Sequence, residues 1–239
     1  FCTHGMHNLC AQRRIVGVAC TEYRKNGAMA QYIAVKAHTL YALPAAVSFE
    51  QGCLVEPFAV GMHAVLRSGL AAGQTAAVIG DGTIGLMTLI AAKSQGAQVC
   101  ISGHHARPLQ LAARLGALDA ALLPQLTEER GADIVYDAVG SQSSFARAME
   151  LVRKGGRIMV IGNHARTIDF PLQRCITEQI DVQFSYSSAG EYPVCLQAIA
   201  EGRADLTGLW QSFSLEEGPG VFERLIQRDE SLTKAILIP

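Results

Sequence analysis

The sequence lacks any strong excess of charge, since 20 Lys and Arg residues face 21 Asp and Glu residues and leave a formal net charge of −1. Proteins that bind nucleic acid or anionic membrane surfaces usually carry a basic patch, so we expect neither as a partner. No run reaches the roughly 18 apolar residues that a membrane-spanning helix needs. Internal repeats and low-complexity tracts are also absent. With 49% hydrophobic and 17% charged residues, the composition is typical of a soluble globular protein.

The start of the chain has neither a basic leader nor an apolar signal segment, and its first residue is Phe1 instead of Met. We interpret this start as a cut into a longer protein. A disulfide framework is not expected either, because the seven cysteines are scattered and most lie in apolar or mixed surroundings, as reduced thiols do. We therefore expect a cytoplasmic protein. The cysteines are Cys2, Cys10, Cys20, Cys53, Cys100, Cys175 and Cys195.

The pattern of apolar residues changes near residue 56. Before it, we expect short strands at residues 15–20 and 30–35, and just after it a helix at residues 58–69. From residue 75 onward, short apolar runs alternate with helical patterns, which predicts a parallel sheet covered by helices on both faces. The expected strands are residues 76–79, 99–102, 122–123, 132–137, 157–162 and 179–185, and the expected helices are residues 84–95, 107–116, 143–153 and 192–202.

This alternation predicts an α/β fold of the doubly wound, Rossmann type. A glycine-rich turn, Gly80-x-Gly82-x-x-Gly85, lies directly between its first strand and first helix. In such a loop the first glycine makes a tight turn, the second lets the backbone approach a pyrophosphate, and the third lets the helix lie close to the strand. The sequence therefore predicts a dinucleotide site at Gly80, Gly82, Thr83, Ile84 and Gly85. Asp81 is unexpected there, because its charge would repel a pyrophosphate unless the side chain points to solvent.

The end of the second strand bears on the choice between NAD and NADP. An acidic residue usually stands there and binds the ribose 2′-hydroxyl of NAD, but Gly103 occupies that position here. Without a carboxylate, a 2′-phosphate could be bound by Ser102, His104, His105 and Arg107, since guanidinium groups bind phosphate well. We expect NADP as the cofactor. The alternative is that these are ordinary loop residues and that NAD binds without its usual anchor.

Several further motifs accompany the glycine loop. They are Cys2-x7-Cys10, residues 27–32 (Gly-Ala-Met-Ala-Gln-Tyr), Leu43-Pro44, residues 55–61 (Val-Glu-Pro-Phe-Ala-Val-Gly), residues 133–140 and residues 154–162. With this set the chain resembles the medium-chain dehydrogenase/reductase superfamily along its whole length. Within it, the chain looks most similar to the zinc-dependent branch of sorbitol, threonine and related alcohol dehydrogenases, without the N-terminal part.

The resemblance implies a GroES-like, mostly β catalytic domain that is split in sequence. Its parts would be residues 1–55 and a C-terminal return at residues 205–239, with a Rossmann domain at residues 56–204 between them. It also implies nicotinamide contacts at Ile161, Gly162 and Asn163, and in the segment near Ser187. Polyol-type members tend to carry an arginine where we align Ser187, so a polyol substrate in particular is not implied.

The resemblance also implies zinc. Cys2 and Cys10 match the last two ligands of a structural site with four thiolates. Glu56 lies between apolar neighbours, where burial would be costly unless it is paired or metal-bound, and it matches a Glu at or near the catalytic zinc. The alternative for Glu56 is a helix-start residue favoured by the helix dipole. His63, on the same helix, is expected to be a packed core residue.

The implied activity is reversible hydride transfer between an alcohol and NAD(P), with zinc as a Lewis acid on the alcohol oxygen. The catalytic residues are unknown, because most would precede Phe1, so this chain alone should bind cofactor without turnover. Two alternatives remain: a zinc-free quinone or enoyl reductase of the same superfamily, and a non-catalytic dinucleotide-binding relative. The expected partners are a small alcohol or ketone and, as is common in the family, further copies of the chain in a dimer or tetramer.

Overall fold

The computed structural model describes residues 1–12, 15–20, 23–128, 130–227, 229 and 231–239. Its centre is a six-stranded sheet in the order β5-β4-β3-β6-β7-β8, and every neighbouring pair in it is parallel. The chain thus builds outward in one direction from β3 and then restarts at β6 on the other side. This is the doubly wound strand order, and it confirms the predicted fold class. The strands are β3 (Thr75–Ile79), β4 (Gln98–Ser102), β5 (Leu118–Asp119), β6 (Ala132–Asp137), β7 (Val152–Val160) and β8 (Asp181–Phe184).

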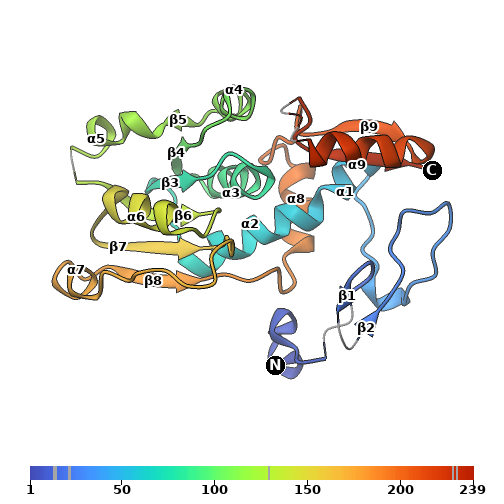
Figure 1. Ribbon diagram of the computed structural model, residues 1–239, viewed down its shortest axis with the longest axis horizontal. Coiled ribbons are helices and arrows are strands. Elements are labelled where there is room, and N and C mark those ends of the chain that lie inside the picture. Colours follow the sequence, from blue (N-terminus) through green and yellow to red (C-terminus); the bar gives the residue numbers. More distant parts are fainter. Residues whose placement is uncertain (13–14, 21–22, 129, 228, 230) are drawn as a thin grey trace.

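Helices cover both faces of this sheet (Figure 1). One face carries α2 (Val55–Ser68), α3 (Thr83–Ser94), α4 (Ala106–Arg114) and α8 (Tyr192–Ala200), and the other carries α5 (Leu123–Leu126), α6 (Gln142–Leu151) and α7 (Leu172–Thr177). An apolar core lies on each face of the sheet. Successive residues of β3 point to the two cores alternately: Ala76 and Val78 pack in the core with α2 and α3, and Ala77 and Ile79 in the core with α6. That alternation follows from the two-residue period of a strand, and it explains why β3 is apolar throughout.

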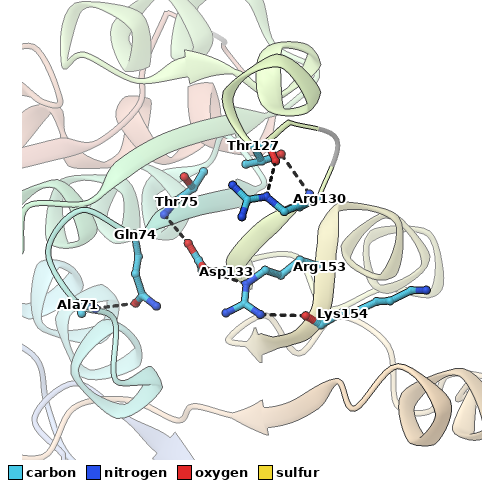
Figure 2. A network of polar contacts seen from close by, with 9 residues as sticks. Ala71, Gln74, Thr75, Thr127, Arg130, Asp133, Arg153 and Lys154 are labelled. Atoms are coloured by element: carbon cyan, nitrogen blue, oxygen red, sulfur yellow. Dashed lines mark hydrogen bonds and ion pairs between the residues drawn. The ribbon is translucent and has the colours of Figure 1, made fainter.

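A polar network connects the amino-terminal ends of three strands, β3, β6 and β7 (Figure 2). Asp133 at the start of β6 accepts a hydrogen bond from the backbone N–H of Thr75 in β3 at 2.9 Å and from Nε of Arg153 in β7 at 2.8 Å. Arg153 also donates to the carbonyl of Lys154 at 2.9 Å. One carboxylate therefore holds three adjacent strands in register. The network lies at the amino-terminal ends of the strands, whereas the glycine loop follows the carboxyl end of β3. Its role is therefore structural.

The expected strand at residues 122–123 is wrong. The edge strand is β5, Leu118–Asp119, which pairs with Cys100 and Ile101 of β4. The side chain of Asp119 then accepts the backbone N–H of Ala121 at 2.8 Å and starts a 3-10 turn. This turn leads into α5, which has a proline in its first turn. A side-chain cap of this kind competes with strand pairing, and it turns Leu122 and Leu123 into helical residues.

The described residues up to Val47 are loop-rich and lie below and to the right of the sheet in Figure 1. Their strands are β1 (Ala19–Cys20) and β2 (Tyr23–Arg24), which form an antiparallel pair. The expected strand at residues 30–35 is wrong, because strands need a hydrogen-bonding neighbour and no described strand pairs with it. Tyr32 is 91% exposed, and among the described side chains Val47 is the first that is buried.

Two further elements complete the chain. The short helix α1 (Phe49–Cys53) begins at a reciprocal cap between Ser48 and Gln51 and leads into α2. After α8, β9 (Gln211–Ser214) pairs in parallel with β10 (Ala235–Ile238), and α9 (Gly218–Ile226) connects them. The last strand of the chain thus pairs within its own segment. No helix among the described residues is both long and apolar enough to span a membrane.

Candidate functional site

The glycine loop joins β3 to α3 with the geometry that its spacing predicts. Gly80 has a φ of 105°, a conformation that side chains disfavour. A Cβ atom on Gly85 would lie 1.8 Å from the carbonyl oxygen of Gly80, so only glycine lets α3 start this close to β3. A Cβ atom on Gly82, in contrast, would have no heavy atom within 4 Å. Gly82 therefore leaves open space in front of the amino end of α3, where unpaired N–H groups favour an anion.

That space belongs to a cavity of about 740 Å³ at the carboxyl ends of β3, β4 and β6. It lies where the strand order reverses, which is where doubly wound sheets bind their ligands. Of the residues predicted for the cofactor, the structure brings nine together in its lining: Gly80, Gly82, Thr83, Ile84, Gly85, Ser102, Gly103, His104 and His105. The other four do not line it: Arg107, Ile161, Gly162 and Asn163.

The charged and titratable groups of the lining are mostly cationic or imidazole groups. Arg147 lines the cavity from α6 and His164 from the loop after β7, in addition to His104 and His105 from the loop after β4. Asp81 is the acidic residue of the lining. Arg147 also forms a 2.7 Å ion pair with Glu150 in an exposed position. The balance favours an anionic ligand. Sequence reasoning missed Arg147 and His164, because neither lies in a recognisable motif.

Asp81 points into the protein and not to solvent, so its charge needs hydrogen-bond partners within the fold. The residue is buried, and its Oδ2 accepts the backbone N–H groups of His104 at 2.8 Å and His105 at 2.6 Å. Its Oδ1 lies 2.9 Å from Nδ1 of His105. Burial by itself raises the pKa of this carboxyl, but the hydrogen bonds from the side chain and backbone of His105 and from His104 outweigh it, and the pKa lies below its usual value. The charge is thus held by the loop after β4.

Asp137 shapes the opposite wall. This fully buried carboxylate ends β6 and accepts the N–H groups of Val139 and Gly140 at 2.9 Å each, and the hydroxyl of Ser144 at 2.9 Å. It fixes the turn after β6 and the start of α6, and the cavity is lined by residues of both. The Asp-x-x-Gly spacing and the serine-rich start of α6 could have identified this role.

Two of the predicted contact residues have other tasks in the structure. The hydroxyl of Thr83 donates to the carbonyl of Thr233 at 3.2 Å, so it ties the C-terminal segment to the start of α3. A Cβ atom on Gly162 would lie 2.1 Å from the backbone carbon of Val139. Gly162 therefore allows close packing between the loops after β6 and β7, which explains the glycine without any ligand.

The predicted metal residues lie apart from the cavity. The thiol of Cys10 hydrogen-bonds to that of Cys2 and raises the pKa of Cys2, so the two side chains meet as a pair of zinc ligands would. Glu56 is exposed in the first turn of α2, where the helix-start alternative places it, and its role at a metal stays a prediction. Within the described part of the chain, no three His, Cys, Asp or Glu side chains come together as a metal site.

His63 is a hydrogen-bonded residue and not simply a packed one. Its Nδ1 lies 2.7 Å from Oε1 of Glu191, with both side chains largely buried. Asn8, between the two cysteines, lies 3.4 Å from its Nε2 and also donates to the carbonyl of Tyr186 at 2.7 Å. The segment between Cys2 and Cys10 is thereby attached to α2 and to the loop before α8. The sequence gives no sign of this network, because its members are distant along the chain.

Comparison with known proteins gives a consistent picture. The family described as zinc-binding dehydrogenase matches residues 83–201. The chain is 28% identical to a sorbitol dehydrogenase of Bacillus subtilis, and the match covers 100% of the chain and 70% of that protein. It is 30% identical to an uncharacterised zinc-type alcohol dehydrogenase-like protein of Escherichia coli, over 99% of the chain and 70% of that protein. A solved structure of an Escherichia coli oxidoreductase/dehydrogenase of unknown specificity superposes with a TM-score of 0.90 at 29% identity, covering 99% of the chain and 70% of that protein.

Proposed function

The chain belongs to the zinc-binding dehydrogenase family, and from this premise we propose that it is the cofactor-binding part of an NAD(P)-dependent alcohol dehydrogenase. In the proposed reaction, the alcohol carbon gives a hydride to C4 of the nicotinamide, the hydroxyl proton is released, and a ketone or aldehyde and the reduced cofactor remain. The substrate class is a secondary alcohol, a polyol or an amino alcohol. The likeness to the sorbitol dehydrogenase of Bacillus subtilis supports this class.

The observation that carries the proposal is the cavity of about 740 Å³ at the reversal point of the sheet, with the glycine loop in its wall. A dinucleotide needs an open approach to the amino end of α3, and Gly82 leaves one. The backbone N–H groups of residues 82–85 would hold the pyrophosphate. Residues 102–105 would hold the adenosine end, and the loop after β7 would be available to the nicotinamide end. Ile161, Gly162 and Asn163 are kept as candidates there, because a bound cofactor can reach residues beyond the cavity lining.

We propose NADP as the preferred cofactor, with NAD as the alternative. The loop after β4 carries no acid of its own, and the charge of Asp81 is compensated by three N–H donors. His104 and His105 line the cavity beside Ser102, and Arg107 follows in the first turn of α4. These groups can donate to a 2′-phosphate.

Zinc is proposed as the metal, and it supplies Lewis-acid chemistry in enzymes of this kind. The meeting of the Cys2 and Cys10 thiols supports these two residues as half of a structural, four-thiolate site. Glu56 remains a candidate near the catalytic metal. It is exposed, and within the described part of the chain no two further His, Cys, Asp or Glu side chains join it in a metal site. We therefore assign no catalytic step to a residue of this chain.

Self-association is part of the proposal. The edge of the sheet at β8 and the neighbouring helix α7 expose large apolar side chains, with Phe184 at 64%, Ile176 at 66% and Leu172 at 61%. Exposed apolar residues on an edge strand and on the helix before it are suited to contact with a second copy of the chain. A cytoplasmic location is also part of the proposal, because buried thiols such as those of Cys100 and Cys195 are typical of reduced proteins.

The test is an assay of the full-length protein for zinc content and for oxidation of a panel of secondary alcohols, polyols and amino alcohols with NADP and NAD. The proposal expects bound zinc and cofactor reduction with at least one alcohol class. Reduction of quinones or enones by a zinc-free protein would assign it to the reductase alternative. Cofactor binding without turnover of any substrate would assign it to the non-catalytic alternative.

A further inference from the structure

The carboxylate of Asp81 occupies the space beside the end of β4. A Cβ atom on Gly103 would lie 2.4 Å from Cγ and Oδ2 of Asp81 and 2.5 Å from its Cβ. Atoms cannot approach this closely, so position 103 cannot carry a side chain while Asp81 keeps its place. Gly103 is therefore explained by Asp81, a residue 22 positions earlier in the glycine loop.

Position 103 directly follows the last residue of β4, Ser102, where an acid for the ribose 2′-hydroxyl ordinarily stands. An acid there could not coexist with Asp81, for lack of room and because two carboxylates would repel each other. The charge of Asp81 does not take over the role of that acid, since both of its oxygens accept N–H groups of the loop itself.

The same contacts fix the loop. Two backbone N–H groups and one imidazole nitrogen converge on a single carboxylate, and such charge-assisted hydrogen bonds are stronger than neutral ones. The ring of His105 is held by its Nδ1, so that it lines both the large cavity and a smaller hollow of about 210 Å³ next to Thr83. The contact with Asp81 thus sets the orientation of the imidazole ring of His105.

We propose that Asp81 is a positioning residue for cofactor choice: it excludes a ribose-binding acid from position 103 and orients the turn of residues 103–105 toward a 2′-phosphate. This inference rests on the proposed preference for NADP. It assigns a role to the second residue of the glycine loop, whose hydrogen bonds go to the loop after β4.

The first experiment measures the dissociation constants of 2′,5′-ADP and 5′-AMP for the full-length protein by calorimetry. Asp81→Asn keeps the shape of the side chain but places an amide where the charge was. We expect about tenfold weaker binding of 2′,5′-ADP, the size of one lost charge-assisted hydrogen bond, with 5′-AMP nearly unchanged. Asp205→Asn is the matched control, because Asp205 is an exposed aspartate that accepts one backbone N–H, from Thr207 at 2.8 Å, outside the cavity.

Moving the carboxylate from position 81 to position 103 tests whether Asp81 excludes an acid from position 103. We expect Gly103→Asp alone to weaken both ligands, and the double variant Asp81→Gly with Gly103→Asp to restore 5′-AMP binding while 2′,5′-ADP stays weak. Thermal unfolding of each variant shows that it is folded. Equal weakening of both ligands by Asp81→Asn would make Asp81 merely structural and overturn the proposal, as would strong 5′-AMP binding by Gly103→Asp alone. In the wild-type protein, the ratio of the dissociation constants of 2′,5′-ADP and 5′-AMP tests the NADP preference. The change of this ratio in the Asp81 variants tests the role of Asp81, so the two claims can fail separately.

Discussion

His63 in α2 and Glu191 directly before α8 form a 2.7 Å contact between Nδ1 and Oε1 across 128 positions of sequence. The second oxygen of Glu191 accepts the backbone N–H of Ala189 at 2.5 Å. The carboxylate thereby connects α2 to the loop before α8, and both helices contribute to the same core. Because the pair is largely buried, removing one partner leaves the other unpaired in the interior, which costs more than breaking a surface ion pair.

The pair predicts a loss of stability in acid. Burial raises the pKa of Glu191, but the hydrogen bonds from His63 and Ala189 outweigh it and hold the pKa below the usual 4.5. The folded state therefore binds this proton less readily than the unfolded state, so the contribution is present above about pH 4.5 and is lost as the pH falls through the folded value. Glu191→Gln should lower the free energy of unfolding at neutral pH by about 1–3 kcal/mol and reduce its fall in acid.

Chemical denaturation at a series of pH values provides the measurement for this pair. Glu178→Gln is the control, since Glu178 forms a surface pair with Arg174 at 3.1 Å and should cost at most about 0.5 kcal/mol. Equal effects of the two substitutions at neutral pH would contradict the assigned role of the His63–Glu191 pair.

A second prediction concerns the buried hydroxyl pair of Ser68 and Tyr136. Their oxygens lie 2.7 Å apart, both residues are fully buried, and Ser68 also donates to the carbonyl of Val65 at 2.7 Å. Tyr136→Phe leaves Ser68 with a partner and should cost about 0.5–1.5 kcal/mol, whereas Ser68→Ala leaves a buried phenol without one and should cost about 1–3 kcal/mol. Urea unfolding of both variants checks this order. A larger cost for Tyr136→Phe would show that loss of the hydroxyl contact is not the dominant effect.

A third prediction separates folding from cofactor binding within the glycine loop. Gly85→Ala places a methyl group against the carbonyl of Gly80 and should destabilise the protein by about 1–3 kcal/mol or more. Gly82→Ala meets nothing within 4 Å in the folded protein, so it should leave the melting temperature nearly unchanged and weaken cofactor binding. Thermal unfolding and cofactor titration of both variants distinguish these effects. Undiminished binding by Gly82→Ala would place the pyrophosphate elsewhere.

The cysteine pair gives a prediction on metal content. If Cys2 and Cys10 are zinc ligands, Cys2→Ser and Cys10→Ser should each lower the zinc content of the full-length protein by one ion per chain. Cys53→Ser is the control, because Cys53 is an exposed free thiol elsewhere in the chain. Atomic absorption on the purified variants provides the measurement. Identical zinc content in all of them would remove the pair from the metal site.

Features set by neighbouring residues could be predicted from sequence. The glycine loop and the strands and helices around it depend on local spacing, and the structure has them where the pattern places them. The strand expected at residues 30–35 depends on a pairing partner that the described chain does not supply. The exposure of Glu56 could not be predicted either, because it depends on what packs against the first turn of α2.

The contacts of Asp81 show the same limit within the site. From the sequence alone, a carboxylate in a phosphate-binding loop looks unfavourable. The partners of this carboxylate lie 23 and 24 positions away along the chain. Only the parallel pairing of β3 with β4 brings the two loops together. The absence of an acid at position 103 was readable from the sequence, but its steric cause was not.

The most direct test of the account is a fluorescence titration of the full-length protein with NADPH and with NADH. We predict saturable binding of both, with NADPH the tighter, and weaker binding of both by Gly82→Ala at nearly unchanged thermal stability. Equal affinity for the two cofactors would contradict the NADP preference alone. Absence of binding for either would contradict the assignment of the cavity between β3, β4 and β6 as a dinucleotide site.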